Sequence, residues 1–259
     1  MLPTVLKLGG ELLEDAAAVR TAASAIVRLA AREPLAVIHG GGRAIDAELR
    51  ARGVTPRFAD GLRITDSDTL DSVVAVLAGR TNTALVAAIG ALGGNAVGLT
   101  GADARIGLAV KVSPLSTING ERVDLGLVGE PIGSNVTLIA DLLGLRYVPV
   151  VASVGMAADG TLLNVNADTF AAHLAAVLGA RRLIVAGTTP GVLDGSGDTI
   201  PEITESDVAR LTASGTAHSG MVAKLTACRH AVTGGVRDVS IVAGRGVEDF
   251  DVAVGTRVS

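Results

Sequence analysis

Short apolar runs alternate with longer segments rich in alanine and leucine along most of the chain. Apolar runs of roughly four to eight residues between turn residues are typical of buried strands, whereas the longer segments have the length and periodicity of helices. This alternation predicts βαβ units around a mainly parallel sheet. We expect strands at 5–8, 35–39, 148–154, 183–186 and 239–242, a buried strand at 96–99 and an edge strand at 256–258.

Helices are predicted where the alanine- and leucine-rich segments follow these strands. Asp15 or a neighbour starts the first helix, which runs to about Arg32, because aspartate is a favoured helix N-cap. Asn164-Val165-Asn166 leads into another helix at 167–178. Further helices are expected at 43–52, 139–143, 208–213 and 221–234, and 66 to about 92 is predicted as two helices or one bent helix.

The remaining segments have the residues of loops and hairpins. The segment 54–65 is predicted as a loop or hairpin, and 187–197 as a loop rich in glycine, proline and aspartate. The segment 108–128 is predicted as a hairpin, because Asn119-Gly120 between apolar flanks suits a tight turn.

Composition narrows the class of protein. With 259 residues, of which 49% are hydrophobic and 19% charged, the chain can form one large domain or two modest ones, and disorder is excluded. A net charge of -4 and an aromatic share of 2% argue against nucleic-acid binding. No apolar stretch reaches the roughly 18 residues of a membrane span, and the first strand begins too near Met1 for a leader. We expect a soluble, cytoplasmic protein.

Lysine is scarce, and its positions are informative. Only three of the 22 basic residues are lysines, and two of them, Lys7 and Lys224, lie in glycine-flanked segments. A lysine ammonium is a compact point charge that fits where a planar guanidinium does not. Point charges beside glycine-rich backbone indicate phosphate binding. Lys111 has no such neighbours and is expected to have no special role.

Two glycine turns follow the first two strands. Gly9-Gly10 ends the first, and Gly40-Gly41-Gly42 ends the second. In a parallel sheet such turns meet at one edge and direct backbone N–H groups into a ligand crevice, so they predict a two-sided anion cradle. The second turn fails the dinucleotide fingerprint G-x-G-x-x-G/A at its last position. The spacing from Gly215 to Gly220 is that of a P-loop, but Met221 stands where a lysine is required.

The sequence offers no metal-binding motif. Its four histidines are scattered without ligand spacing, and we expect His39 to support the glycine turn that follows it. The single cysteine, Cys228, is interpreted as a buried core residue because it lies in a helical segment.

Six motifs occur in order along the chain. They are Lys7-Leu8-Gly9-Gly10, His39-Gly40-Gly41-Gly42, Gly61-Leu62-Arg63-Ile64-Thr65, Asp124-Leu125-Gly126-Leu127-Val128-Gly129, Asn164-Val165-Asn166-Ala167-Asp168 and Gly220-Met221-Val222-Ala223-Lys224. With these motifs the chain resembles the N-acetylglutamate kinases of the amino acid kinase family, and the resemblance covers essentially its whole length. It implies a three-layer αβα sandwich with a mainly parallel central sheet and two lobes. Residues 1–178 would bind N-acetyl-L-glutamate and form a homodimer, and 179–259 would bind ATP.

The resemblance also implies a reaction and a role for each matching residue. The γ-phosphoryl group of ATP would pass to the side-chain carboxylate of N-acetyl-L-glutamate, with Mg²⁺ arriving on ATP and no metal ligand on the chain. Lys7 and Lys224 would stabilise the charge of the transition state, and Asp168 would orient both lysines and favour their charged forms. The implied binding residues are Gly9 and Gly10 for phosphate, Gly41, Gly42, Arg63 and Asn164 for the substrate, and Thr188, Gly191, Leu193, Gly220 and Met221 for the nucleotide.

Two departures and two alternatives remain open. Thr188 stands where the family usually carries aspartate, and Ser219 where glycine or aspartate is common, so the contacts to the nucleotide are in question. One alternative is a kinase of the same family that acts on aminoadipate or glutamate attached to a carrier protein. The other is a non-catalytic amino-acid sensor, against which the joint presence of Lys7, Asp168 and Lys224 argues.

A further expectation concerns the first residues of the chain. Family members inhibited by arginine resemble one another in an N-terminal helix that links dimers into a hexamer. Here only Met1–Thr4 precede the first strand, and a segment that short does not form a stable helix. We therefore expect a dimer that is insensitive to arginine.

Overall fold

A single large sheet organises the computed structural model, which describes residues 1–116, 120, 122–213 and 219–259. Its strands are β1 (Thr4–Leu8), β2 (Leu35–His39), β5 (Ala96–Thr100), β10 (Val148–Ala152), β13 (Arg182–Gly187), β14 (Glu202–Ile203), β15 (Asp238–Ala243) and β16 (Gly255–Val258). Their order is β14-β16-β15-β13-β1-β2-β10-β5. All neighbours from β15 to β5 are parallel, whereas β16 is antiparallel to β15. The predicted mainly parallel sheet is confirmed.

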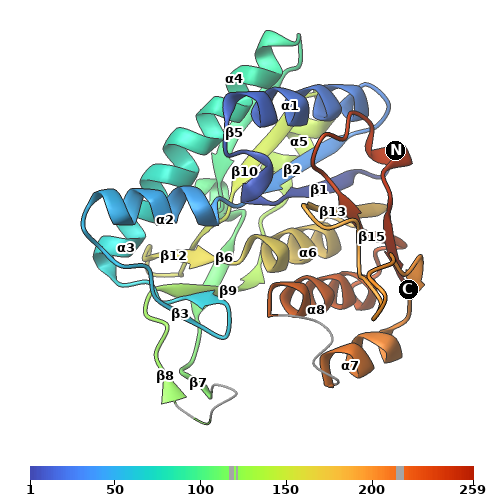
Figure 1. Cartoon of the computed structure of the whole chain (residues 1–259). Coiled ribbons are helices and arrows are strands. Elements are labelled where there is room, and N and C mark those ends of the chain that lie inside the picture. The colour runs from blue at the N-terminus through green and yellow to red at the C-terminus, as the bar shows by residue number, and fades with distance from the viewer. Residues whose placement is uncertain (117–119, 121, 214–218) are drawn as a thin grey trace.

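Helices cover both faces of this sheet (Figure 1). Side chains of α1 (Ala16–Ala30), α4 (Asn82–Ala91) and the short η4 (Phe250–Val252) share one buried apolar cluster with one face. Side chains of α5 (Thr137–Gly144), α6 (Ala167–Val177), α7 (Glu205–Ala213) and α8 (Ser219–Thr233) share another cluster with the opposite face. The three-layer αβα sandwich is therefore confirmed.

The alternation of side chains along β1 decides which layer each residue enters. Leu6 and Leu8 are buried in the cluster that contains α1, and Val5 is buried in the cluster that contains α6 and α8. Because successive side chains of a strand point to opposite faces, Lys7 lies on the same face as Val5. A lysine in the middle of this apolar strand is thus directed toward α6 and α8.

Helix caps follow the local sequence. The Asp15 side chain accepts hydrogen bonds from the backbone N–H groups of Ala17 and Ala18, and so begins α1 as predicted. Asn166 caps α6 in the same way, through the N–H groups of Asp168 and Thr169. These caps satisfy N–H groups that the first turn of a helix leaves without partners.

The segment from Ser67 to Ala91 is one continuous helix of 25 residues, which was predicted as two helices or one bent helix. It consists of α3 (Ser67–Val74), a π-helical stretch η2 (Ala75–Thr81) and α4. This element is long and apolar enough to cross a membrane by length and composition alone, and 33% of its most apolar window is buried. Its α4 part packs against α1 and β5, as expected of a core helix in a folded protein.

Smaller elements surround the carboxyl edge of the large sheet. Four strands, β6 (Leu108–Lys111), β9 (Val128–Gly133), β11 (Val154–Met156) and β12 (Leu162–Val165), close into a second sheet. The remaining elements are two hairpins, one helix and two 3-10 turns. The hairpins are β3 (Phe58–Ala59) with β4 (Leu62–Arg63) and β7 (Leu115–Ser116) with β8 (Arg122–Val123). The helix is α2 (Gly42–Ala51), and the 3-10 turns are η1 (Gly10–Leu12) and η3 (Asp103–Arg105).

The structure corrects three of the predicted elements. The strand predicted to be buried at 96–99 is β5, an edge strand in which Gly98 is exposed, because β10 lies between it and β2. The strand predicted at the edge, 256–258, is β16, and the short β14 covers it. The predicted strand 148–154 is interrupted at Ser153, where the chain passes from β10 in the large sheet to β11 in the second sheet. Within the predicted hairpin 108–128, β7 and β8 pair antiparallel on either side of the predicted turn, whose Asn119 lies outside the described residues. β6 pairs antiparallel with β9, which begins only at Val128, the last residue of the predicted segment.

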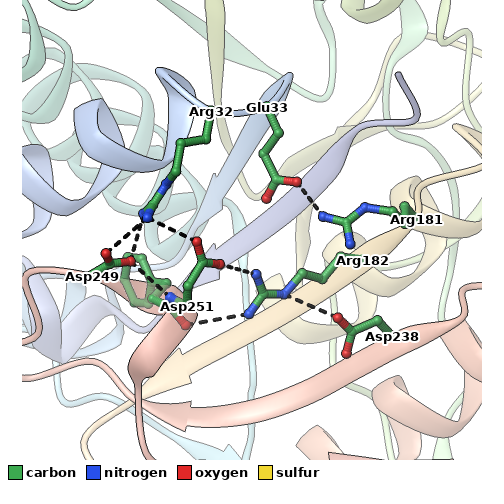
Figure 2. A network of polar contacts seen from close by, with 8 residues as sticks. Arg32, Glu33, Arg181, Arg182, Asp238, Asp249 and Asp251 are labelled. Carbon is green, nitrogen blue, oxygen red and sulfur yellow. Dashed lines mark hydrogen bonds and ion pairs between the residues drawn. The ribbon is translucent and has the colours of Figure 1, made fainter.

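An ion-pair network joins segments from both halves of the sequence at the amino ends of the parallel strands. Arg32, before β2, pairs with Asp249 and Asp251 of the loop that contains η4, and Arg182 at the start of β13 also pairs with Asp251. Figure 2 shows how Asp251 lies between these two arginines. The hydrogen bond from Arg32 holds the pKa of Asp249 at about 2, so this carboxylate stays charged at any physiological pH. The network lies at the opposite end of the strands from the glycine turns.

Candidate active site

The centre of the candidate site is a carboxylate between two lysines. Asp168 Oδ1 lies 2.7 Å from Lys7 Nζ, and Asp168 Oδ2 lies 3.7 Å from Lys224 Nζ. Lys7 comes from β1, Asp168 from the first turn of α6 and Lys224 from α8, which packs against α6. The three residues predicted to be catalytic are thus brought together from segments far apart in the sequence.

The charges of the lysines control the protonation of Asp168. Burial alone would raise the pKa of this carboxyl group, which is only 6% exposed. The positive charges of Lys7 and Lys224 outweigh burial and hold the pKa below its ordinary value. Asp168 is therefore ionised at neutral pH and forms an ion pair with each lysine.

The two glycine turns lie directly against each other. A Cβ atom added at Gly10 would be 2.5 Å from Gly41 Cα, so the close approach of the two turns requires a glycine there. A Cβ at Gly9 would collide with the carboxylate of Glu11, and a Cβ at Gly42 would meet nothing within 4 Å. α2 begins at Gly42, so the positive end of its dipole faces this point. The two glycine turns therefore meet beside the start of α2, as predicted, and the N–H group of Gly9 is already bonded to the carbonyl oxygen of Ala186.

His39 supports the second glycine turn, as predicted. Its Nδ1 lies 3.2 Å from the carbonyl oxygen of Gly40, and its Nε2 lies 3.1 Å from Nδ2 of Asn82. Burial lowers the pKa of His39 to about 4, so the ring is neutral at physiological pH. In the neutral tautomer that fits both contacts, Nδ1 donates to Gly40 and Nε2 accepts from Asn82. The histidine fixes the turn and takes no part in charge stabilisation.

A cleft of about 240 Å³ opens beside the glycine turns. Its polar lining includes Lys7, Asp168, Arg63 and Asn164 together with the glycine turns. All four residues that were predicted to bind the amino-acid substrate, Gly41, Gly42, Arg63 and Asn164, therefore line the same cleft as Lys7 and Asp168. Apolar side chains also line the cleft, among them those of Ile45, Phe58, Leu62, Leu77 and Val128.

Arg63 is held by contacts that the sequence reasoning did not find. Its Nη1 lies 2.7 Å from Oδ1 of Asp46, and its Nη2 donates a hydrogen bond of 3.1 Å to the carbonyl oxygen of Gly42. Its guanidinium carbon lies 4.7 Å from the centre of the Phe58 ring. Asp46 lies about one helical turn after Gly42 in α2, and this spacing is the only feature of the sequence that could have indicated its contact with Arg63.

Asn164 is oriented by Thr65, which is fully buried. Asn164 Nδ2 donates to Thr65 Oγ1 at 3.1 Å, and Thr65 Oγ1 donates to the carbonyl oxygen of Arg63. The backbone of Thr65 in turn pairs with Leu125 and Leu127 of the predicted motif 124–129. Gly126 has φ +74° and a Cβ there would collide with the Thr65 carbonyl, which explains the glycine in this motif.

The five residues predicted to contact the nucleotide lie outside the lining of this cleft. Thr188 follows β13 and is exposed, and Gly191 has φ +112° where the loop passes Thr256. Leu193 is half-buried and forms a β-bridge with Thr199. Gly220 is exposed in the first turn of α8, whereas Met221 packs against the core cluster that contains α6. The structure therefore places Gly220 and Met221 on the helix that carries Lys224, and the other three on a loop after β13.

Two predicted structural roles outside the site agree with the structure. Cys228 is completely buried, and burial raises the pKa of its thiol far above the ordinary value, so it is unreactive. Lys111 forms an exposed ion pair with Asp124 at 3.4 Å. Among the described residues, no three histidine, cysteine, aspartate or glutamate side chains cluster closely enough to hold a metal ion.

Comparison with known proteins assigns the family. A model described as the amino acid kinase family matches residues 3–243. The chain belongs to the amino acid kinase family. An acetylglutamate kinase of Bradyrhizobium diazoefficiens is 41% identical to it over 248 residues, which cover 93% of this chain and 83% of that relative. An acetylglutamate kinase of Sphingopyxis alaskensis is also 41% identical over 248 residues, which cover 93% of this chain and 82% of that relative.

Solved structures show the same fold at lower sequence identity. An N-acetylglutamate synthase from Neisseria gonorrhoeae, complexed with coenzyme A and N-acetyl-glutamate, matches with a TM-score of 0.84 and 22% identity. The match covers 100% of this chain and 59% of the synthase chain. A carbamate kinase from Giardia lamblia bound to AMP-PNP matches with a TM-score of 0.65 and 16% identity, covering 99% of this chain and 98% of that chain. These likenesses confirm the amino acid kinase architecture.

Proposed function

We propose that this protein transfers the γ-phosphoryl group of ATP to the side-chain carboxylate of N-acetyl-L-glutamate, a step of arginine biosynthesis. The observation that carries the proposal is the ion-paired group Lys7–Asp168–Lys224 beside the glycine turns, with Arg63 in the lining of the same cleft as Lys7 and Asp168. Curated relatives that bear the name acetylglutamate kinase match 93% of the chain, which supports this substrate.

The chemistry asks for charge stabilisation rather than proton transfer. The attacking carboxylate is already an anion at neutral pH, so no general base is needed. The difficulty lies in bringing this anion to a polyphosphate and in stabilising the charge that spreads over the transferring group. Lys7 and Lys224 would place positive charges on either side of that group, and the N–H groups of Gly10, Gly41 and Gly42 would bind the phosphoryl oxygens and the attacking carboxylate.

The other residues of the cleft lining suit the rest of the acceptor. Arg63 would bind the α-carboxylate through two N–H groups, and Asn164 would hydrogen-bond the same amino acid. The apolar side chains of Leu62, Leu77 and Val128 would contact the methylene and acetyl carbons. A substrate with two carboxylates therefore matches a cleft that both Arg63 and Lys7 line.

The nucleotide would approach from the side of α8 and β13. Residues 179–259 supply Thr188, Gly191, Leu193, Gly220 and Met221, and we assign them to ATP, with 1–178 binding the acyl amino acid. Mg²⁺ would arrive on the phosphates of ATP, where it neutralises part of their charge. In that arrangement Lys7, Lys224 and the N–H groups of Gly10, Gly41 and Gly42 would bind the phosphate oxygens.

An ADP-release assay with three acceptors tests the proposed function. Turnover with N-acetyl-L-glutamate and little with free glutamate or aminoadipate is expected, and the same experiment separates the two alternatives. Preference for a carrier-protein-linked acceptor would reveal the related kinase, and binding of N-acetylglutamate without ADP release would reveal a sensor.

Replacing Arg63 tests the assignment of the acceptor end. Arg63→Ala should raise the KM for N-acetylglutamate at least about 10-fold, because a bidentate carboxylate contact is lost, and should change the KM for ATP less than about 2-fold. Equal damage to both constants would place Arg63 outside the amino-acid pocket.

We further propose a cytoplasmic homodimer that pairs through the exposed face of the helix Ser67–Ala91. The exposed residues of α4 are small, Ala84 and Ala87 among them, and they lie beside the edge strand β5. Small side chains allow two helices to approach closely. Light scattering after size exclusion should give the mass of a dimer for the wild type and of a monomer for Ala87→Arg, and a monomeric wild type would refute the proposal.

A further inference from the structure

Asp46 forms an ion pair with Arg63, a residue of the cleft lining, and the proposed function leaves this pair unused. It lies on α2, and its Oδ1 is 2.7 Å from Nη1 of Arg63. The Asp46 side chain is 20% exposed and the Arg63 side chain 7%, so the pair is largely shielded from solvent. An ion pair in such a place is far less screened than one on the surface.

Two elements fix the guanidinium group of Arg63. From α2, Asp46 forms the ion pair with Nη1 and the carbonyl oxygen of Gly42 accepts a hydrogen bond from Nη2, and from β3 the ring of Phe58 covers the guanidinium on one side. A guanidinium has five N–H donors, and the hydrogen bond to Gly42 engages one of them. Nη1 is buried against Asp46, so Nε and the second N–H of Nη2 are the donors left for a ligand in the cleft that Arg63 lines.

We propose that Asp46 is a positioning residue for Arg63, and that it sets the affinity for the α-carboxylate of the acceptor rather than the rate of phosphoryl transfer. The inference rests on the proposed function, because it assumes that Arg63 binds a carboxylate. An arginine has several rotatable bonds, and fixing its orientation before the ligand arrives removes an ordering cost from binding. Asp46 itself does not line the cleft, so in this role it acts through Arg63.

The opposite role is also physically possible and predicts the opposite result. If Asp46 instead competed with the ligand carboxylate for the same N–H groups, its removal would strengthen ligand binding. The geometry favours positioning, because Gly42 and Phe58 hold Arg63 in the same orientation as Asp46 does, from other directions. The sign of the change in affinity therefore decides between positioning and competition.

The test uses Asp46→Asn, with Glu48→Gln as a matched control. Glu48 lies on the same helix and also pairs with two arginines, Arg52 at 2.7 Å and Arg80 at 2.9 Å, but it does not line the cleft. For Asp46→Asn we expect the KM for N-acetylglutamate to rise about 10- to 30-fold, while kcat and the KM for ATP change less than about 2-fold. Glu48→Gln should leave all three constants unchanged within about 2-fold.

Two further measurements separate positioning from a general effect on folding. Calorimetric titration of N-acetylglutamate in the absence of ATP should show the same loss of affinity. When Asp46→Asn is combined with Arg63→Ala, the double variant should bind N-acetylglutamate less than about 2-fold more weakly than Arg63→Ala alone, because Asp46 then has no arginine to position. Asp46→Glu keeps the charge on a longer side chain and should recover part of the affinity.

The outcomes distinguish this inference from the proposed function. A wild type that neither binds nor phosphorylates N-acetylglutamate would refute the function itself. An active wild type with an unchanged or lower KM in Asp46→Asn would refute the positioning role, as would an equal loss in kcat. If Asp46→Asn does not fold, the Asp46→Glu variant and the double variant decide between the outcomes. The inference would be overturned if Asp46→Glu bound N-acetylglutamate and ATP as tightly as the wild type and the double variant also showed a large additional loss.

Discussion

At the scale of single residues, the chemistry of the site depends on charges held in a confined space. Lys7 is 5% exposed and stands in the centre of the large sheet, where its neighbours along β1 are apolar. A point charge on a thin stem can reach Asp168 from that position, whereas a guanidinium needs a wider space and different hydrogen-bond directions. The scarcity of lysine in the chain therefore has a structural counterpart at Lys7.

Removing either lysine should cost two to three orders of magnitude in turnover. We expect Lys7→Ala and Lys224→Ala each to lower kcat roughly 10²- to 10³-fold, the usual loss for one preorganised transition-state donor. Lys7→Arg should recover little, because its guanidinium cannot occupy the buried position of the ammonium. Steady-state kinetics at saturating substrates checks this, and a Lys7→Arg enzyme with more than about half the wild-type activity would contradict it.

The lowered pKa of Asp168 predicts a pH-dependent contribution to stability. A carboxyl group with a lower pKa in the folded state stabilises the fold above its unfolded pKa of about 3.9, and this contribution is lost as the pH falls through the folded value. Asp168→Asn should therefore cost about 3–5 kcal/mol at pH 7, because two lysines lose their buried partner. Urea denaturation from pH 7 to pH 3 should show the wild type approaching the variant only at the acid end. A constant difference over the whole range would show that the charge of Asp168 is not the cause.

At the scale of elements, the turns after β1 and β2 form one unit although 30 residues separate Gly10 from Gly40. Strand register brings them together, because Leu8 of β1 pairs with His39 of β2. The absence of a side chain at Gly10 lets the first turn rest on the backbone of the second. The predicted anion cradle is therefore a property of two paired strands rather than of either loop.

Alanine substitutions in the two turns should have unequal effects. Gly10→Ala places a Cβ 2.5 Å from Gly41 Cα, so the two turns must separate, and we expect kcat to fall at least about 10²-fold. Gly42→Ala meets no atom within 4 Å and keeps its N–H group, so activity should stay within about 3-fold of the wild type. Kinetics of both variants, with thermal melting to confirm folding, tests this difference. Similar losses in both would show that the contact between the turns does not matter.

At the scale of the whole molecule, the ion-pair network and the active site lie at opposite ends of the strands. Arg182 is central to the network, since it pairs with Asp251 at 2.5 Å and with Asp238 at 3.5 Å (Figure 2). Its side chain is 14% exposed, whereas Arg28, which pairs with Glu248, is 49% exposed. The network connects the start of β13 with the loop after β15. We therefore expect it to contribute to the stability of the sheet rather than to the activity of the site.

Arg182→Gln should lower stability and leave the kinetics unchanged. We expect a loss of about 1–2 kcal/mol in the free energy of unfolding, between the values for exposed and for buried pairs. The control Arg28→Gln should cost less than about 0.5 kcal/mol because its pair is exposed to solvent. Denaturant titrations give both values, and a change in the KM of either substrate for Arg182→Gln would show that the network reaches the active site.

The sequence by itself determined the local features of this protein. Strand and helix positions follow from apolar periodicity, and Asp15 and Asn166 are visible as caps because short polar side chains bind free N–H groups within a few residues. Lys7 and the glycine turns after β1 and β2 were recognisable for the same reason, since each is defined by its immediate neighbours. The family motifs added Lys224, Asp168, Arg63 and Asn164, which the structure brings to one place.

Only the tertiary structure decided what depends on contacts between distant segments. It made β5 an edge strand, although its apolar residues resemble those of a buried one, because strand order is not encoded in local periodicity. It also joined Asp46 to Arg63 and Thr65 to Asn164, pairs that are 17 and 99 residues apart in the chain. Sequence periodicity reports which face of an element is buried, but a side-chain pair between two elements exists only once packing has set their distance and orientation.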